Sequence, residues 1–144
     1  MASTKTSRAR KTKTVARKAA APAPRARRLP KGVSAAIRAA LDKKALDVVV
    51  LDLRKAGGFT DYSVICTGTS GRQIQAIADA VKTALKTDLG ERPVLAEGVE
   101  KSQWILLDYV DFVVHVFSRE CRDFYALERL WGNAERREIS DVPS

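Results

Sequence analysis

Apolar residues recur along this chain with two periods, one of three to four residues and one of two residues. The longer period predicts three helices. The first begins after Ser34 as its N-cap and runs to about Leu46, with inner positions Ile37, Leu41 and Ala45. The second is capped by Thr69 or Ser70 and ends at Gly90, with inner positions Ile74, Ile77, Ala78, Val81 and Leu85. The third begins near Glu120, with inner positions Phe124, Leu127, Leu130 and Trp131.

Strands are predicted where the shorter period or a β-branched run replaces the helical period. Residues 48–53, VVVLDL, are typical of a strand covered on both faces, which we expect in the middle of a sheet. The other expected strands are Tyr62 to Gly68, a short edge strand from Pro93 to Leu95, and a hairpin of 104–107 and 112–117 closed around Tyr109-Val110. This order of elements predicts a single-domain α/β sandwich with a mixed sheet.

The two faces of the expected hairpin differ in composition. If Asp108 faces Asp111, then Leu106 pairs with Val113 and Trp104 with His115, and all these side chains lie on one side. The other side is wholly apolar and is expected to be core, with Ile105, Leu107, Phe112, Val114 and Val116.

An apolar centre with acidic groups at its rim is typical of a protein-binding patch, and the carboxylates favour a basic partner. The alternative is that a helix of the same domain covers this face and that His115 is a core histidine with a hydrogen-bond partner.

The positive charge of the chain is concentrated at its N-terminus. Residues 1–31 hold 11 of the 26 Lys and Arg and none of the 17 Asp and Glu, so the remainder is slightly acidic. We therefore expect a disordered basic arm over 1–32, a folded domain over 33–132, and a C-terminal tail over 133–144. An organelle transit peptide is the alternative interpretation of residues 1–31.

Cysteine content and hydropathy indicate a cytoplasmic protein. Cys66 and Cys121 are too few for a disulfide framework, and each lies in an apolar context that suits a buried thiol. No run of 18 apolar residues exists, and the N-terminus lacks the apolar segment of a secretory signal. An organelle remains the alternative if the arm is a transit peptide.

The sequence carries no recognisable catalytic motif. Residues 67–73, TGTSGRQ, place free backbone amides at a helix N-terminus, where an anion can bind, but they match neither a Walker loop nor a dinucleotide fingerprint. A nucleotidyltransferase would need an Asp-x-Asp pair for magnesium, and none follows. Cys66 and His115 lie in no nucleophile motif, and a single His with two separated Cys makes no zinc site. We expect no catalytic residue, no metal and no cofactor.

Four motifs together resemble the Iojap family, also called ribosomal silencing factors. They are DVVVLDL, TDYSVICTGTSGRQIQAIAD, the Glu97-Gly98 pair, and WILLDYVDFVVHVFSRECRDFYALERLW, which span about residues 33–132 in order. The resemblance implies a nucleotidyltransferase-like α/β fold without the catalytic carboxylates. It also implies binding to the large ribosomal subunit through its ribosomal protein fourteen, so that the small subunit cannot join and translation is repressed when nutrients are scarce.

Carried over to this sequence, the resemblance implies partner-binding residues within the hairpin: Trp104, Leu106, Asp108, Tyr109, Asp111 and His115. The strand alternation adds Val113. This chain has Val110 where the family usually has glycine, and a β-branched residue resists the positive φ of a type I′ turn. The resemblance therefore does not fix the geometry of the turn or the position of Tyr109.

Two other functions remain open, a nucleotidyltransferase-like enzyme using residues 67–73 and a general RNA-binding protein. The slightly acidic folded part and the lack of an aromatic RNA-stacking motif disfavour the second. In the favoured interpretation the basic arm adds a contact to ribosomal RNA, and the exposed face could pair two free copies into a homodimer.

Overall fold

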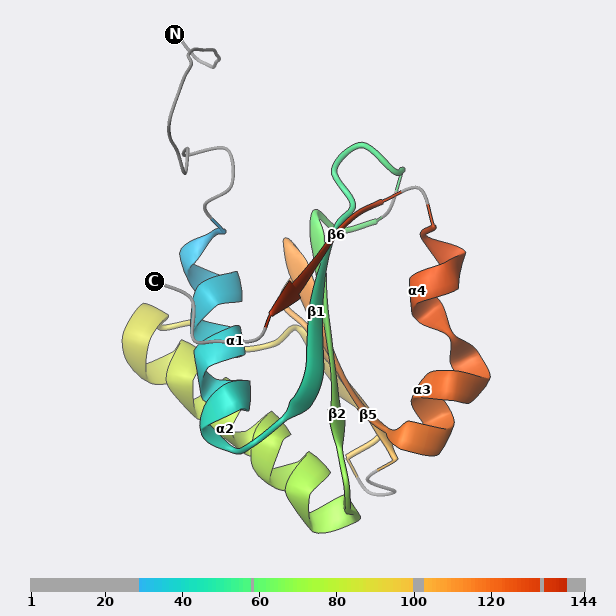
Figure 1. The fold of residues 1–144 in the computed structure, drawn as a ribbon. Coiled ribbons are helices and arrows are strands. Elements are labelled where there is room, and N and C mark those ends of the chain that lie inside the picture. The colour runs from blue at the N-terminus through green and yellow to red at the C-terminus, as the bar shows by residue number, and fades with distance from the viewer. Residues whose placement is uncertain (1–28, 58, 100–102, 133, 140–144) are drawn as a thin grey trace, which may run out of the picture. The chain divides into compact units, whose positions relative to one another are not determined.

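The computed structural model describes residues 29–57, 59–99, 103–132 and 134–139, and the helices and strands among them belong to one compact unit that begins at Lys31. Residues 1–28 of the arm expected over 1–32 lie outside the described residues, and Lys31 and Gly32 belong to the first helix. The elements in chain order are α1 Lys31–Asp42, β1 Leu46–Asp52, β2 Tyr62–Gly68, α2 Gly71–Leu89, β3 Leu95–Glu97, β4 Trp104–Asp108, β5 Phe112–Ser118, α3 Arg119–Tyr125, α4 Leu127–Leu130 and β6 Glu135–Ile139 (Figure 1).

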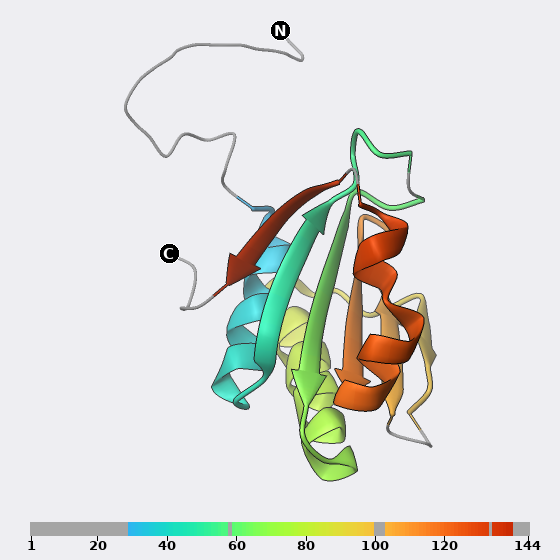
Figure 2. The ribbon, with the colours of Figure 1, turned by 45° about the vertical axis from the view of Figure 1, so that its right-hand side comes forward.

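The strands form one mixed sheet in the order β3-β4-β5-β2-β1-β6. Strands β2 and β5 run parallel, whereas the other neighbouring pairs are antiparallel. Helices α1 and α2 cover one face, and α3 with α4 covers part of the other (Figures 1 and 2). The predicted α/β sandwich with a mixed sheet is confirmed.

Helix α2 agrees closely with its prediction. Ser70 is the N-cap, and its side chain accepts a hydrogen bond from the Gln73 N–H. Gly90 is left-handed at φ 67° and ends the helix by donating to the Leu85 and Lys86 carbonyls. The predicted inner residues are the buried ones, and they pack on the sheet face that carries Ile105, Leu107 and Val114. This face is therefore the core.

Helix α1 differs from its prediction at both ends. It begins at Lys31 instead of after Ser34, and it ends at Asp42 instead of near Leu46. Its first turn buries Gly32 against the Phe112 ring, where even an added Cβ would come within 2.7 Å of a ring carbon. This tertiary contact, which local capping rules do not include, extends the helix beyond the predicted cap.

Strand β1 lies one place from the edge of the sheet instead of in its middle, with β2 on one side and the edge strand β6, which pairs with it from Val48 to Asp52, on the other. It is covered on both faces as predicted, since Val48 to Leu51 are all buried. Strand β6 was not predicted, and its residues fall within the expected C-terminal tail. The ERREI sequence of β6 is mostly charged, and only Arg137 and Ile139 are half-buried, so hydropathy gave no strand signal.

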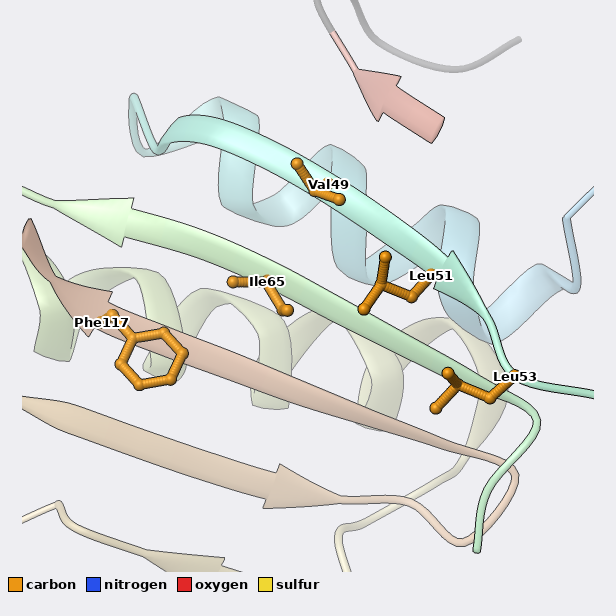
Figure 3. Close-up of a cluster of buried hydrophobic side chains, with 5 residues drawn as sticks. All are labelled: Val49, Leu51, Leu53, Ile65 and Phe117. Atoms are coloured by element: carbon orange, nitrogen blue, oxygen red, sulfur yellow. The ribbon is translucent and has the colours of Figure 1, made fainter. Parts of the chain in front are cut away.

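The predicted third helix is broken in two. Ala126 adopts a left-handed conformation at φ 46°, which ends α3 and shifts the phase of α4. Leu127 and Trp131 still pack on a buried cluster of the sheet, shown in Figure 3 and made of Val49, Leu51, Leu53, Ile65 and Phe117. Phe124 and Leu130, predicted to point inward, are instead 80% and 68% exposed.

Arg122 of α3 joins both helices to the sheet. Its side chain is buried, and its Nη1 donates to the Asp47 carbonyl at 2.6 Å and to the Thr67 hydroxyl at 2.8 Å. Its Nε and Nη2 donate to the two oxygens of the Glu128 carboxylate at 3.1 and 2.9 Å. The hydrogen bonds from Arg122 lower the pKa of Glu128, so this pair stays charged inside the fold.

Candidate docking surface

The sheet face that carries α3 is left partly uncovered over β3, β4 and β5. Paired residues of neighbouring strands share a face, so the pairs Leu95 with Asp108 and Glu97 with Leu106 extend this face onto β3. We call this set the open face: Leu95, Glu97, Trp104, Leu106, Asp108, Val113 and His115. Leu95 is 45% exposed, and Leu106 and Val113 are half-buried.

The hairpin register differs from the predicted one by two residues. Leu106 pairs with His115 instead of Val113, and Trp104 pairs with Phe117. The turn is centred one residue later than expected, because the Tyr109 N–H donates to the Phe112 carbonyl at 2.9 Å. A shift of two residues keeps every side chain on its predicted face, so the division into two faces stands.

Five of the seven candidate residues lie on the open face: Trp104, Leu106, Asp108, Val113 and His115. Tyr109 is not among them, since it is buried and its ring stacks on that of Phe112, with centroids 5.0 Å apart, on the opposite side. Burial raises the pKa of Tyr109 to about 12, and its hydroxyl has no hydrogen-bond partner among the described residues. Asp111 lies exposed in the turn, where its carbonyl accepts from the Asp61 and Tyr62 N–H groups.

The turn forces Val110 into a left-handed conformation, with φ 75°. The Asp111 N–H donates to the Tyr109 carbonyl, as in a γ-turn. The Val110 N–H donates to Asp108 Oδ1, and its carbonyl accepts from the Thr60 hydroxyl, both at 2.8 Å. For a β-branched residue this conformation costs about 1–3 kcal/mol, and these hydrogen bonds hold it.

Trp104 and His115 join the open face to the interior. Trp104 Nε1 donates to His115 Nδ1 at 3.1 Å, and the Trp104 ring stacks on Phe117 with centroids 5.0 Å apart. Desolvation lowers the pKa of His115 to about 4. The imidazole is therefore neutral at pH 7 with its proton on Nε2, because Nδ1 accepts the indole hydrogen bond.

The structure divides this face into a covered part and an uncovered part. His115 is only 9% exposed and has a hydrogen-bond partner, as a core histidine would. Tyr125 of α3 covers Trp104, with ring centroids 4.6 Å apart. The part toward β3 is uncovered, and there Leu106 pairs with Glu97 and shares its face with Asp108, two residues further along β4.

A second candidate site is the pocket at the carboxyl ends of the parallel strands β2 and β5. Its volume is about 480 Å³, and it is lined by Thr67 to Gly71, Ile74, Gln103 and Ser118 to Glu120. The Thr69 N–H and hydroxyl both donate to Gln73 Oε1, while the Gln73 amide donates to the Lys43 and Lys44 carbonyls. This turn therefore ties α2 to the end of α1.

The pocket does not carry the ligand set of a nucleotidyltransferase, because Glu120 is the single carboxylate among its described lining residues. Elsewhere in the described residues, no group of three or more His, Cys, Asp or Glu is placed to hold a metal ion. Cys66 pairs with Val116 and His115 with Ile65, so the thiol and the imidazole point to opposite faces and cannot act as nucleophile and base. Burial raises the pKa of Cys66 to about 12.

The family model described as "Ribosomal silencing factor during starvation" matches residues 26–144. The chain belongs to this family. The silencing factor RsfS of Halalkalibacterium halodurans is 40% identical over 109 residues, which cover 76% of this chain and 92% of the relative. The RsfS protein of Bacillus subtilis is 41% identical over 93 residues, covering 65% and 78%. The chloroplastic Iojap protein of Zea mays is 36% identical, covering 71% of this chain and 44% of the relative.

Solved structures agree with this membership. The crystal structure of a Chromobacterium violaceum protein superposes on this chain with a TM-score of 0.69 at 34% identity, covering 79% of this chain and 94% of the other. The suspected resemblance to the Iojap and ribosomal silencing factors is thus confirmed. None of the described helices has the length and apolar content needed to cross a membrane.

Sequence reasoning missed three contributors to the open face and its border. Leu95 and Glu97 join it through pairing of β3 with β4, which a three-residue strand does not reveal in a sequence. The apolar spacing predicts a continuous helix with Phe124 pointing inward, whereas in α3, which ends at Tyr125, it is Tyr125 that packs on Trp104. The usable signal was residue parity along the two strands of the hairpin, which assigned the other residues of the open face to one side.

Proposed function

We propose that this silencing factor binds the large ribosomal subunit with its open face, through ribosomal protein fourteen of that subunit. The bound factor occupies the joining surface, so the small subunit cannot associate and translation is repressed. The observation that carries the proposal is the uncovered part of the face, where apolar side chains of three strands share the surface with the carboxylates of Glu97 and Asp108. Steric occlusion requires no chemical step, so the factor acts without catalysis and without a cofactor.

The composition of the open face supports a basic protein partner. Partly exposed aliphatic side chains such as Leu106 and Val113 can be desolvated at the centre of an interface, where most binding energy arises. Glu97 and Asp108 at the rim attract positive charge and orient the partner, and they repel a bare phosphate backbone. A protein surface rich in Lys or Arg fits both requirements.

The basic arm adds to binding in this proposal without determining its specificity. Its Lys and Arg residues are attracted to the phosphates of nearby ribosomal RNA, and this contribution falls steeply with salt. In the free protein the open face can also be buried against a second copy, and such a homodimer would compete with subunit binding. A factor that acts on cytoplasmic ribosomes would itself be cytoplasmic.

The proposal is tested by measuring binding to purified large subunits and their joining to small subunits. Leu106→Asp places a charge at the centre of the face on a half-buried side chain, so the fold should persist. We expect the dissociation constant to rise at least about tenfold and inhibition of joining to weaken in parallel. Thr83→Asp, on the exposed side of α2, is the matched control and should behave as the wild type.

Asp108→Asn removes the negative charge but keeps the hydrogen bond of the turn, because the amide oxygen can still accept from the Val110 N–H. We expect slower association for this variant, since the lost charge steers the encounter. If Leu106→Asp melts at the wild-type temperature and still binds large subunits as tightly as the wild type, the open face is not the docking site.

A further inference from the structure

Helix α3 presents two neighbouring aromatic side chains to solvent. Phe124 is 80% exposed and Tyr125 48% exposed. Their rings meet edge to face at 88° with centroids 5.0 Å apart. Large exposed aromatic groups in contact with each other are typical of interaction sites, because their burial in a complex releases more free energy than most other side chains can supply.

These aromatic rings continue the open face. The Tyr125 ring lies 4.6 Å from the Trp104 ring, and Trp104 donates its indole hydrogen bond to His115. A chain of ring contacts therefore runs from the sheet through Trp104 and Tyr125 to Phe124. A partner seated on the uncovered part of the sheet would meet the flank of α3 at its border.

Among the described residues, the charges of α3 without an ion-pair partner are acidic. Glu120 and Asp123 of α3 are exposed. The two basic residues of α3 are both engaged elsewhere, since Arg119 pairs with Asp47 at 3.0 Å and Arg122 is buried against Glu128. Glu120 lies one helical turn before Phe124, on the same side of α3. An accessible aromatic ring on a helix that exposes carboxylates suits the side chain of an arginine or lysine, which can lie on the ring face while its charge meets a carboxylate.

We propose that Phe124, Tyr125 and Asp123 form an aromatic flank that binds an arginine or lysine side chain of the same basic protein that docks on the open face. This inference rests on the proposed function and adds a second contact to it. The carboxylates make RNA a poor ligand for this flank, because they repel phosphates. Phe124 thus acts in binding, whereas the residues that follow Ala126 fasten α4 to the core.

Binding of the full chain to purified large subunits tests the flank. Phe124 is exposed, so Phe124→Ala should melt at the wild-type temperature while its dissociation constant rises about tenfold. Phe124→Trp keeps an aromatic face and should bind as the wild type, whereas Phe124→Leu should weaken binding nearly as much as alanine does. Asp123→Lys should weaken binding by at least the same factor.

Asp88→Lys is the matched charge reversal, because Asp88 is exposed on α2, which covers the other face of the sheet. It should bind as the wild type. The flank is overturned if Phe124→Ala and Asp123→Lys bind normally, or if Asp88→Lys loses as much affinity as Asp123→Lys. If Phe124→Ala and Asp123→Lys bind normally but Leu106→Asp does not, the proposed function stands without the flank. If Leu106→Asp also binds normally, the proposed function fails.

Discussion

Acidification should destabilise this protein through His115. Burial lowers the pKa of the folded-state imidazole to about 4 from a usual value of 6.5, so the unfolded chain binds the proton more readily than the folded one. The contribution of neutral His115 to the free energy of unfolding is therefore fully present above pH 6.5 and is lost as the pH falls toward 4. Protonation would also set a positive charge beside the Trp104 indole and remove the acceptor at Nδ1.

The two pKa values set the size of the effect. With 6.5 unfolded and about 4 folded, lowering the pH from 7.5 to 5 should remove about 2 kcal/mol of unfolding free energy, and the full loss below pH 4 is about 3 kcal/mol. Carboxylates such as Glu128, whose pKa is lowered by Arg122, add their own loss at low pH. The histidine contribution must therefore be isolated by a variant.

His115→Gln supplies that comparison, because its amide oxygen can accept the Trp104 hydrogen bond but does not titrate. Urea unfolding of both proteins at pH 7.5 and 5.0 should give a pH-dependent loss about 2 kcal/mol smaller in the variant. An NMR titration gives the pKa directly, since the chain has a single histidine and an untagged sample shows one imidazole signal. A measured pKa near 6.5, or equal losses in both proteins, would refute this account of the site.

Three further predictions concern stability, and chemical unfolding measures each. Val110→Gly should stabilise the fold by about 1 kcal/mol, because glycine adopts φ 75° without strain; unchanged or lower stability would contradict the strained turn. Arg122→Ala should lower the free energy of unfolding by about 3 kcal/mol, because it leaves buried partners unpaired. Arg119→Ala removes one member of an exposed ion pair and should cost under about 1 kcal/mol. Equal costs would contradict the role of Arg122 in joining α3 and α4 to the sheet. Gly98→Ala should lower the free energy of unfolding by about 1–3 kcal/mol more than Gly57→Ala does. Both glycines have φ 81°, but a Cβ at position 98 would overlap the Trp104 carbonyl oxygen, whereas a Cβ at position 57 meets nothing. Equal costs would show that the hairpin backbone moves to accommodate the added methyl group.

The sequence predicted the faces of the hairpin better than its register. Alternation decides which face Leu106 and Ile105 occupy, and that signal survives any shift by an even number of residues. The register depends on the turn, where Val110 adopts a conformation that its side chain disfavours. Hydrogen bonds from Thr60 and Asp61, some 50 residues away in the chain, hold this turn, and no local pattern contains them.

The missed elements have a common physical origin, since tertiary contacts overrode local preference. Strand β6 is charged and forms because β1 offers it an unpaired edge. With the helix broken at Ala126, Arg122 contacts the ends of β1 and β2, and Glu128 of α4 pairs with the same Arg122 side chain. Tyr109, expected at the tip of a docking hairpin, instead stacks its ring on that of Phe112 and is buried in the core.

Photocrosslinking from the open face tests the central claim most directly. A photoreactive amino acid in place of Val113, which is half-buried at the uncovered part of the sheet, should crosslink to ribosomal protein fourteen when the factor is mixed with large subunits. The same group in place of Thr83 on α2 should give no such product. A crosslink from position 83 but none from position 113, with both proteins bound to subunits, would show that the other side of the molecule faces the ribosome.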